Sequence, residues 1–74
     1  MVDLVEIAAR LDAEEQFTVK YRFPVRIAGG HVKHETREDK LLDVAEEAGL
    51  IYVSHHGEIL WIKLEEVLEV IPEA

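Results

Sequence analysis

The longest regular pattern in this chain is an alternation of apolar and other residues that begins at residue 17. Apolar side chains occupy successive odd positions: Phe17, Val19, Tyr21, Phe23, Val25 and Ile27. Because successive side chains of a strand point to opposite faces, this alternation predicts a half-buried β-strand. Gly29 and Gly30 follow, and glycine readily adopts the positive φ angles of a two-residue turn. The sequence therefore predicts a hairpin over residues 17–37, with strands at 17–28 and 31–37.

The two-residue turn would place cations opposite one another on the outer face of this hairpin. Arg26 would face Lys33, and Arg22 would face Arg37. Like charges directly opposed across a ladder are destabilising, so this arrangement needs something that neutralises it. Pro24 is expected to disturb this pairing, because a residue without an N–H cannot donate a hydrogen bond to the neighbouring strand. We expect a bulge, a bend or a sheet edge at that position.

The rest of the chain shows helical spacing around a second alternating segment. Apolar residues three and four apart predict one helix over residues 1–15 and another over residues 37–48, which Gly49 would end. Residues 50–55 and 58–63 predict a second hairpin that turns at His56-Gly57. Residues 64–71 have two interpretations. We favour a helix stopped by Pro72, and the alternative is a single turn over 64–66 followed by a short strand over 67–71.

These elements predict a single α+β domain that spans residues 1–74. Its order would be helix, hairpin, helix, hairpin, helix, with a mostly antiparallel four-stranded sheet and helices on one face. Tyr52 would lie opposite Trp61 on a second hairpin whose two faces are both apolar. Such a ribbon lies in the middle of a sheet or keeps one face for a partner. Core packing is our first interpretation of these two aromatic residues, and an interface is the second.

The segments DLVEIAA (3–9) and GEILWIKLEEVLEV (57–70) resemble the small Sm-like barrel proteins that bind termination factor Rho and inhibit it. Those proteins have a short N-terminal helix and a closing pair of strands of this kind. The resemblance implies an SH3/Sm-like five-stranded barrel with an N-terminal helix, which is our alternative fold. The helix predicted over 37–48 stands where that family would need a barrel loop. No functional residue is carried over from the family.

The charge distribution is the most informative signal of function. The chain has 16 acidic and 8 basic residues, yet residues 17–40 hold six of the bases and only three of the acids. This contrast predicts a non-enzymatic protein-binding or regulatory module that contacts an acidic partner through the basic outer face of the 17–37 hairpin. The predicted binding residues are Lys20, Arg22, Arg26, Lys33, Arg37, Tyr52 and Trp61. Nucleic acid is the alternative partner for the same face, although a net charge of −8 repels phosphate. A solvated face without a partner is the simplest interpretation of the same bases.

Signals for catalysis and for bound groups are weak. The sequence has no P-loop, GxGxxG or HExxH motif, and its one serine, Ser54, lies in a predicted strand. His55 and His56 beside Glu58 suit a polar turn better than an acid-base site. A metal site would have to join histidines of both hairpins, because His31 and His34 point to opposite faces of one strand. We predict no catalytic residue, no cofactor and no metal.

Composition suggests where such a chain works. No apolar run approaches the roughly 18 residues of a membrane span, and the N-terminus is acidic, unlike a secretory signal. The chain has no cysteine, which suits a reducing compartment. We therefore expect a cytoplasmic protein without membrane contact. The chain has no asparagine and one glutamine, which suits a thermophile and suits a GC-rich mesophile nearly as well. Strand edges and apolar ribbon faces would also suit a homodimer.

Overall fold

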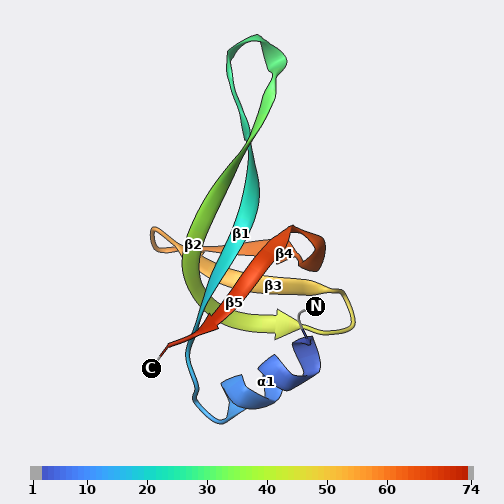
Figure 1. Cartoon of the computed structure of the whole chain (residues 1–74), viewed down its shortest axis with the longest axis vertical. Helices are drawn as coiled ribbons and strands as arrows, with labels where there is room; N and C mark the ends of the chain where they lie inside the picture. Colours follow the sequence, from blue (N-terminus) through green and yellow to red (C-terminus); the bar gives the residue numbers. More distant parts are fainter. Residues whose placement is uncertain (1–2, 74) are drawn as a thin grey trace.

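The computed structural model describes residues 3–73, and in this part of the chain a short helix precedes a five-stranded antiparallel sheet (Figure 1). The elements in chain order are α1 (Leu4–Asp12), β1 (Phe17–Arg26), η1 (Ala28–Gly30), β2 (Val32–Ala45), β3 (Leu50–His55), β4 (Glu58–Lys63), η2 (Leu64–Glu66) and β5 (Val67–Pro72). The strand order is β4-β3-β2-β1-β5, so the last strand pairs with the first. The sheet is open, because β4 and β5 form its two edges.

This architecture shows that the predicted four-stranded fold with three helices is wrong. Residues 37–48 were expected to form a helix, but most of them belong to the long strand β2. The pairing of β2 with β3 shifts between Leu41 and Asp43, so Leu42 forms a bulge. A bulge adds a residue and breaks the strand alternation, which hides the strand in the sequence. The SH3/Sm-like alternative, a five-stranded sheet with an N-terminal helix, fits the structure better.

The predictions for the two ends of the chain have different outcomes. The N-terminal helix is confirmed but shorter than predicted: it covers Leu4–Asp12, and residues 1–2 lie outside the described part. Its cap is Asp3, whose carboxylate accepts hydrogen bonds from the backbone of Val5 and Glu6. The helix favoured over residues 64–71 is wrong. The alternative is confirmed, since the turn η2 leads into β5 and pairing with β1 overrides the helical spacing.

The core confirms the first half of the alternation that begins at Phe17. Phe17, Val19 and Tyr21 are fully buried, Phe23 and Val25 are half-buried, and Ile27 is 46% exposed. The other buried apolar residues come from the helix and from three further strands: Leu4, Ile7, Leu41, Ile51, Val53 and Ile62. The apolar face of β1 therefore leaves the core partway along the strand.

Beyond the core, β1 and β2 continue as a two-stranded projection, seen at the top of Figure 1. We call residues 22–37 the arm. β5 pairs with β1 only as far as Tyr21, and β3 pairs with β2 only from Lys40 onward. The strands of the arm therefore pair only with each other. The arm accounts for the long dimension of the molecule, which measures 46 × 24 × 19 Å.

The turn at the tip of the arm is one residue longer than predicted. The backbone N–H of Ile27 donates to the carbonyl of His31, and Ala28, Gly29 and Gly30 lie between them. Both glycines have positive φ angles, as expected. The longer turn shifts the register by one residue, so every residue of β1 faces a different neighbour on β2.

The shifted register removes the predicted pairs of opposed cations. Arg26 lies opposite Val32, and Arg22 lies opposite Thr36. Lys33 and Arg37 instead share a face with apolar residues of β1. Pro24 lies in a segment of β1 that has no second partner strand, which confirms the expectation of an edge position.

Candidate functional site

The structure separates the charge of the chain into a basic arm and an acidic body. The arm carries four bases and one acid, a net charge of +3, whereas the other residues carry four bases and fifteen acids, a net charge of −11. Together these give the charge of −8 for the whole chain. The bases of the arm are Arg22, Arg26, Lys33 and Arg37. Figure 1 shows that the arm that carries these bases projects away from the body.

Four of the predicted binding residues lie on the arm, and their surroundings differ. Arg26 and Lys33 are exposed and form no ion pair within residues 3–73. Arg22, at the base of the arm, pairs with Glu66 of η2 at 3.5 Å. Arg37 is more enclosed. Two of the arm's four bases are therefore available to a partner without breaking an internal contact.

Arg37 is held by its neighbours on the arm. Its guanidinium lies over the ring of Phe23, 4.1 Å from the ring centroid, and an amino group is 3.5 Å from the carboxylate of Glu35. A cation over an aromatic face is stabilised by the ring quadrupole. Arg37 of β2 is therefore held against Phe23 of β1 near the base of the arm. Lys20, in contrast, lies in the body, half-buried in β1 between Glu38 of β2 and Glu69 of β5. The basic face of the hairpin is therefore smaller in the structure than the sequence predicted.

A groove of about 450 Å³ lies between the base of the arm and β4. Its lining combines apolar and charged side chains from three elements: Arg22, Phe23 and Pro24 of β1, Leu60, Trp61, Ile62 and Lys63 of β4, and Glu65 and Glu66 of η2. We call this the arm-base groove. It brings Trp61 of the second hairpin beside Arg22 of the first, two predicted binding residues that lie far apart in the sequence.

Trp61 is an exposed aromatic residue on this groove. It lies opposite Tyr52 in the β3–β4 ladder, as predicted, but 60% of its surface is exposed, so the core interpretation is wrong for Trp61. Tyr52 is half-buried. Ile59, on the same strand, is 71% exposed. Exposed large side chains grouped in this way are typical of interaction surfaces.

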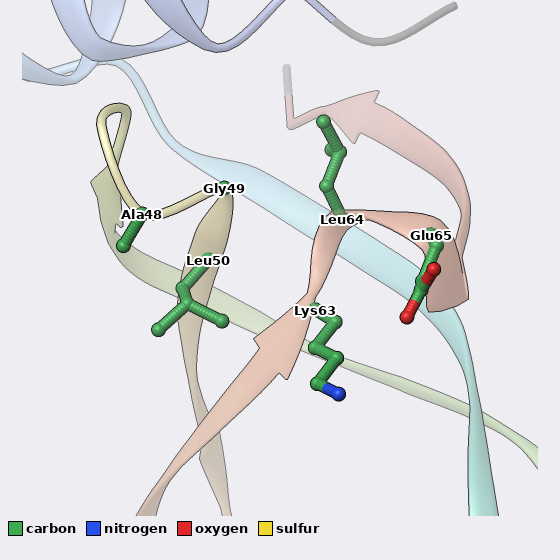
Figure 2. A pocket seen from close by; sticks show the side chains of 6 residues that line it. All are labelled: Ala48, Gly49, Leu50, Lys63, Leu64 and Glu65. Atoms are coloured by element: carbon green, nitrogen blue, oxygen red, sulfur yellow. The ribbon is translucent and has the colours of Figure 1, made fainter.

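A second hollow lies on the other side of the turn that joins β4 to β5. Figure 2 shows its lining, formed by Ala48, Gly49, Leu50, Lys63, Leu64 and Glu65. The side chains of Lys63 and Glu65 point to the same side, whereas Leu64 points the opposite way. Lys63 and Glu65 also line the arm-base groove. This hollow is shallow and open, and the basic arm does not line it, so we assign it no separate role.

A polar cluster joins three strands below the arm. The hydroxyl of Tyr21 donates to Oδ2 of Asp39 at 2.6 Å, and Nδ1 of His55 lies 2.9 Å from the same oxygen. Burial, with help from the Asp39 carboxylate, raises the pKa of Tyr21 to about 12. Asp39 lies in β2 and not near the start of the helix predicted over 37–48. His55 does lie opposite Glu58 in the β3–β4 ladder, but its ring contacts Asp39. The cluster instead fixes β1, β2 and β3 to one another where the arm begins.

Sequence reasoning missed most of the groove. Phe23 packs against the core, as expected for the apolar face of its strand, but its place in a groove was not predicted. Leu60, Lys63 and Glu66 were given no binding role. The turn η2 brings Glu65 and Glu66 to β1, and this follows only when residues 67–72 are read as a strand that pairs with β1. The signal for the groove was therefore the short strand over residues 67–71, which was our second interpretation of that segment.

Within residues 3–73 no three histidine, aspartate or glutamate side chains gather as a metal site would require. His31 and His34 lie on or next to the arm strands, and His55 and His56 lie at the β3–β4 turn. The described part of the chain contains no helix long and apolar enough to cross a membrane. Comparison of the chain with protein families, curated proteins and solved structures finds no match in any of the three.

Proposed function

We propose that this chain is a non-enzymatic, cytoplasmic binding or regulatory module that captures an acidic segment of a partner protein with its arm. The observation that carries the proposal is the separation of charge: the arm has a net charge of +3 and projects from a body with a net charge of −11. Opposite potentials steer partners toward each other and fix their orientation. An acidic segment would be attracted by the arm and repelled by the body, so it would bind in one place.

The surface of the arm favours protein over nucleic acid. Ile27 and Val32 near its tip are 46% and 55% exposed. Ile27 follows Arg26 in the chain, and Val32 precedes Lys33 and lies opposite Arg26. Phosphate and sugar offer little to such apolar side chains, whereas a protein segment with both acidic and apolar residues contacts both kinds. The mixed surface is therefore suited to a polypeptide.

The arm-base groove extends this surface toward the body. Exposed tryptophan and arginine residues are the commonest anchors of protein interfaces, and this groove contains Trp61 and Arg22. A partner side chain that enters the groove would meet the apolar walls formed by Phe23 and Leu60. The arm would attract the partner, and the groove would hold it.

Nucleic acid is the competing partner, because Trp61 lies beside Lys63 and exposed aromatic rings also stack on bases. Binding of labelled probes across a salt series separates the two proposals. We expect a fluorescein-labelled peptide of alternating glutamate and valine to bind at low salt, and single-stranded RNA and DNA oligomers to bind much more weakly. Tight binding of the oligomers with a steep salt dependence, and none of the peptide, would contradict the proposal.

A further inference from the structure

β4 is an edge strand whose outer side is unpaired within residues 3–73. The hydrogen bond from the N–H of Leu64 to the carbonyl of Gly49 fixes the phase of the β3–β4 ladder. Antiparallel pairs alternate between hydrogen-bonded and non-hydrogen-bonded positions. Leu64 is at a hydrogen-bonded position, so the residues two and four places before it, Ile62 and Leu60, are at hydrogen-bonded positions as well. Their backbone N–H and C=O groups point toward β3. The backbone N–H and C=O groups that point to the free side belong to Ile59, Trp61 and Lys63.

The two edges of this sheet are protected to different degrees. Natural proteins usually guard an edge strand with a charge, a proline or a bulge. β5 has all three, because it contains Glu69 and Pro72 and its register with β1 skips Leu68. β4 has none of them between its ends, where four apolar residues follow one another. The unprotected edge is therefore β4.

The arm-base groove lies along this unprotected edge. Residues 60–63 form one wall of the groove, and Arg22, Phe23 and Pro24 form the other. In Figure 1, β4 lies on the side of β3 from which the arm projects. A polypeptide that pairs with β4 would therefore lie between β4 and the base of the arm. Its side chains on one face would contact the apolar wall, and its acidic residues would lie near the bases.

The carboxylate of Glu66 lies in the same groove and is already neutralised. Its Oε2 atom is buried, has no hydrogen-bond partner, and lies 3.5 Å from Nε of Arg22 as an ion pair. Lys63 offers a second cation at the end of β4, beside Glu65. The groove itself is therefore close to electrically balanced, and the free positive charge lies above it, on Arg26 and Lys33.

We propose that the acidic partner segment binds as an added strand on the outer side of β4. This inference rests on the proposed function and specifies how the partner is held: by backbone hydrogen bonds to Ile59, Trp61 and Lys63, with its acidic side chains directed to the arm. The occupant is an extended segment in which acidic and apolar residues alternate, because strand side chains point alternately to opposite faces.

Amide hydrogen exchange followed by NMR tests this inference on the wild-type protein. The probe is the glutamate–valine peptide, about eight residues long, which is enough for one strand. We expect the peptide to slow exchange at the amides of Ile59, Trp61 and Lys63. The amides of Leu60 and Ile62, which already face β3, would change little. This alternation in protection is specific to an added strand.

The other outcomes of this experiment each contradict a defined statement. If the peptide binds and Arg26→Glu weakens that binding, but the three outer amides of β4 stay unprotected, the strand inference is wrong and the proposed function stands. If the peptide does not bind at all, the proposed function is wrong. If the outer amides are protected in the free protein in a concentration-dependent way, a second copy of the chain occupies the edge, which also contradicts the inference.

A pair of variants provides an independent test. Trp61→Pro and Trp61→Val both remove the indole ring, but only the first removes the outward N–H. Proline is tolerated on an edge strand where the N–H faces solvent. We expect Trp61→Pro to bind the peptide about tenfold more weakly than Trp61→Val, which corresponds to one backbone hydrogen bond. Equal binding by two variants with the same circular dichroism would overturn the inference.

Discussion

The hydroxyl of Tyr21 donates a 2.6 Å hydrogen bond to Oδ2 of Asp39, and the imidazole of His55 contacts that same oxygen at 2.9 Å. Tyr21 is fully buried and is the last residue of β1 that pairs with β5. The arm therefore starts at a point where three strands are fixed by one carboxylate. This contact links β1, β2 and β3 directly below the arm.

Removing this hydroxyl should lower the stability of the body. We expect Tyr21→Phe to reduce the free energy of unfolding by about 1–2 kcal/mol, because Asp39 would lose the donor that satisfies its buried side. Urea denaturation followed by circular dichroism measures this loss. Tyr52→Phe is the matched control, since it removes a hydroxyl outside the cluster. Equal losses in the two variants would show that the hydrogen bond from Tyr21 to Asp39 adds nothing to the free energy of unfolding beyond the loss of any tyrosine hydroxyl.

The raised pKa of Tyr21 predicts a loss of stability in alkaline solution. Burial raises this pKa from its ordinary 10.0 to about 12, so the folded protein keeps the phenol proton that the unfolded chain releases. The contribution of Tyr21 is therefore complete below pH 10 and is lost as the pH rises through about 12. We expect the difference in stability between wild type and Tyr21→Phe to shrink over that range. A constant difference would contradict this assignment.

The arm should be removable without unfolding the body. Replacing residues 24–34 by Asn-Gly would close the hairpin at Phe23 and Glu35, which already face each other. The deleted residues contribute nothing to the buried core. We expect a cooperative thermal transition that lies within a few degrees of wild type, together with loss of peptide binding. An unfolded product would mean that the arm supports the body.

Trp61 should report binding through its fluorescence. It is the one tryptophan of the chain and is 60% exposed, so its emission should resemble that of a solvated indole. A partner that covers the arm-base groove would exclude water from the ring and shift the emission to shorter wavelength. A titration with the glutamate–valine peptide measures the shift. Binding by anisotropy without any change in tryptophan emission would place the peptide away from the groove.

Local patterns predicted some of this fold correctly. The alternation from Phe17 to Val25 marked a strand, and His56-Gly57 marked the turn that sets Tyr52 opposite Trp61. Both features depend on residues that are close in sequence. Successive side chains of the strand point to opposite faces, and His56 and Gly57 adopt the positive φ angles of the turn. The cap that Asp3 provides for the N-terminal helix is likewise a local hydrogen bond, to the backbone two and three residues away. Interactions of this kind can be recognised in a single sequence.

The errors arose where distant strands decide the structure. Leu41 and Leu42 looked like part of a helical stripe, because a bulge at Leu42 interrupts the alternation of β2. Residues 67–72 had helical spacing, yet pairing with β1 makes them a strand. The arm-base groove depends on both outcomes, since β1 and β4 meet there. Only Arg22 and Trp61 of its lining were predicted as binding residues, from charge and from aromatic character alone.

The measurement that tests the central claim most directly compares charge reversal on the arm with the same reversal on the body. Arg26→Glu and Lys40→Glu change the net charge equally, and both residues are exposed on strands. Binding of the labelled glutamate–valine peptide is followed by anisotropy at low salt. We predict about tenfold weaker binding for Arg26→Glu, more for Arg26→Glu with Lys33→Glu, and little change for Lys40→Glu. Equal weakening by Arg26→Glu and Lys40→Glu would show that net charge alone governs binding, and would contradict a site on the arm.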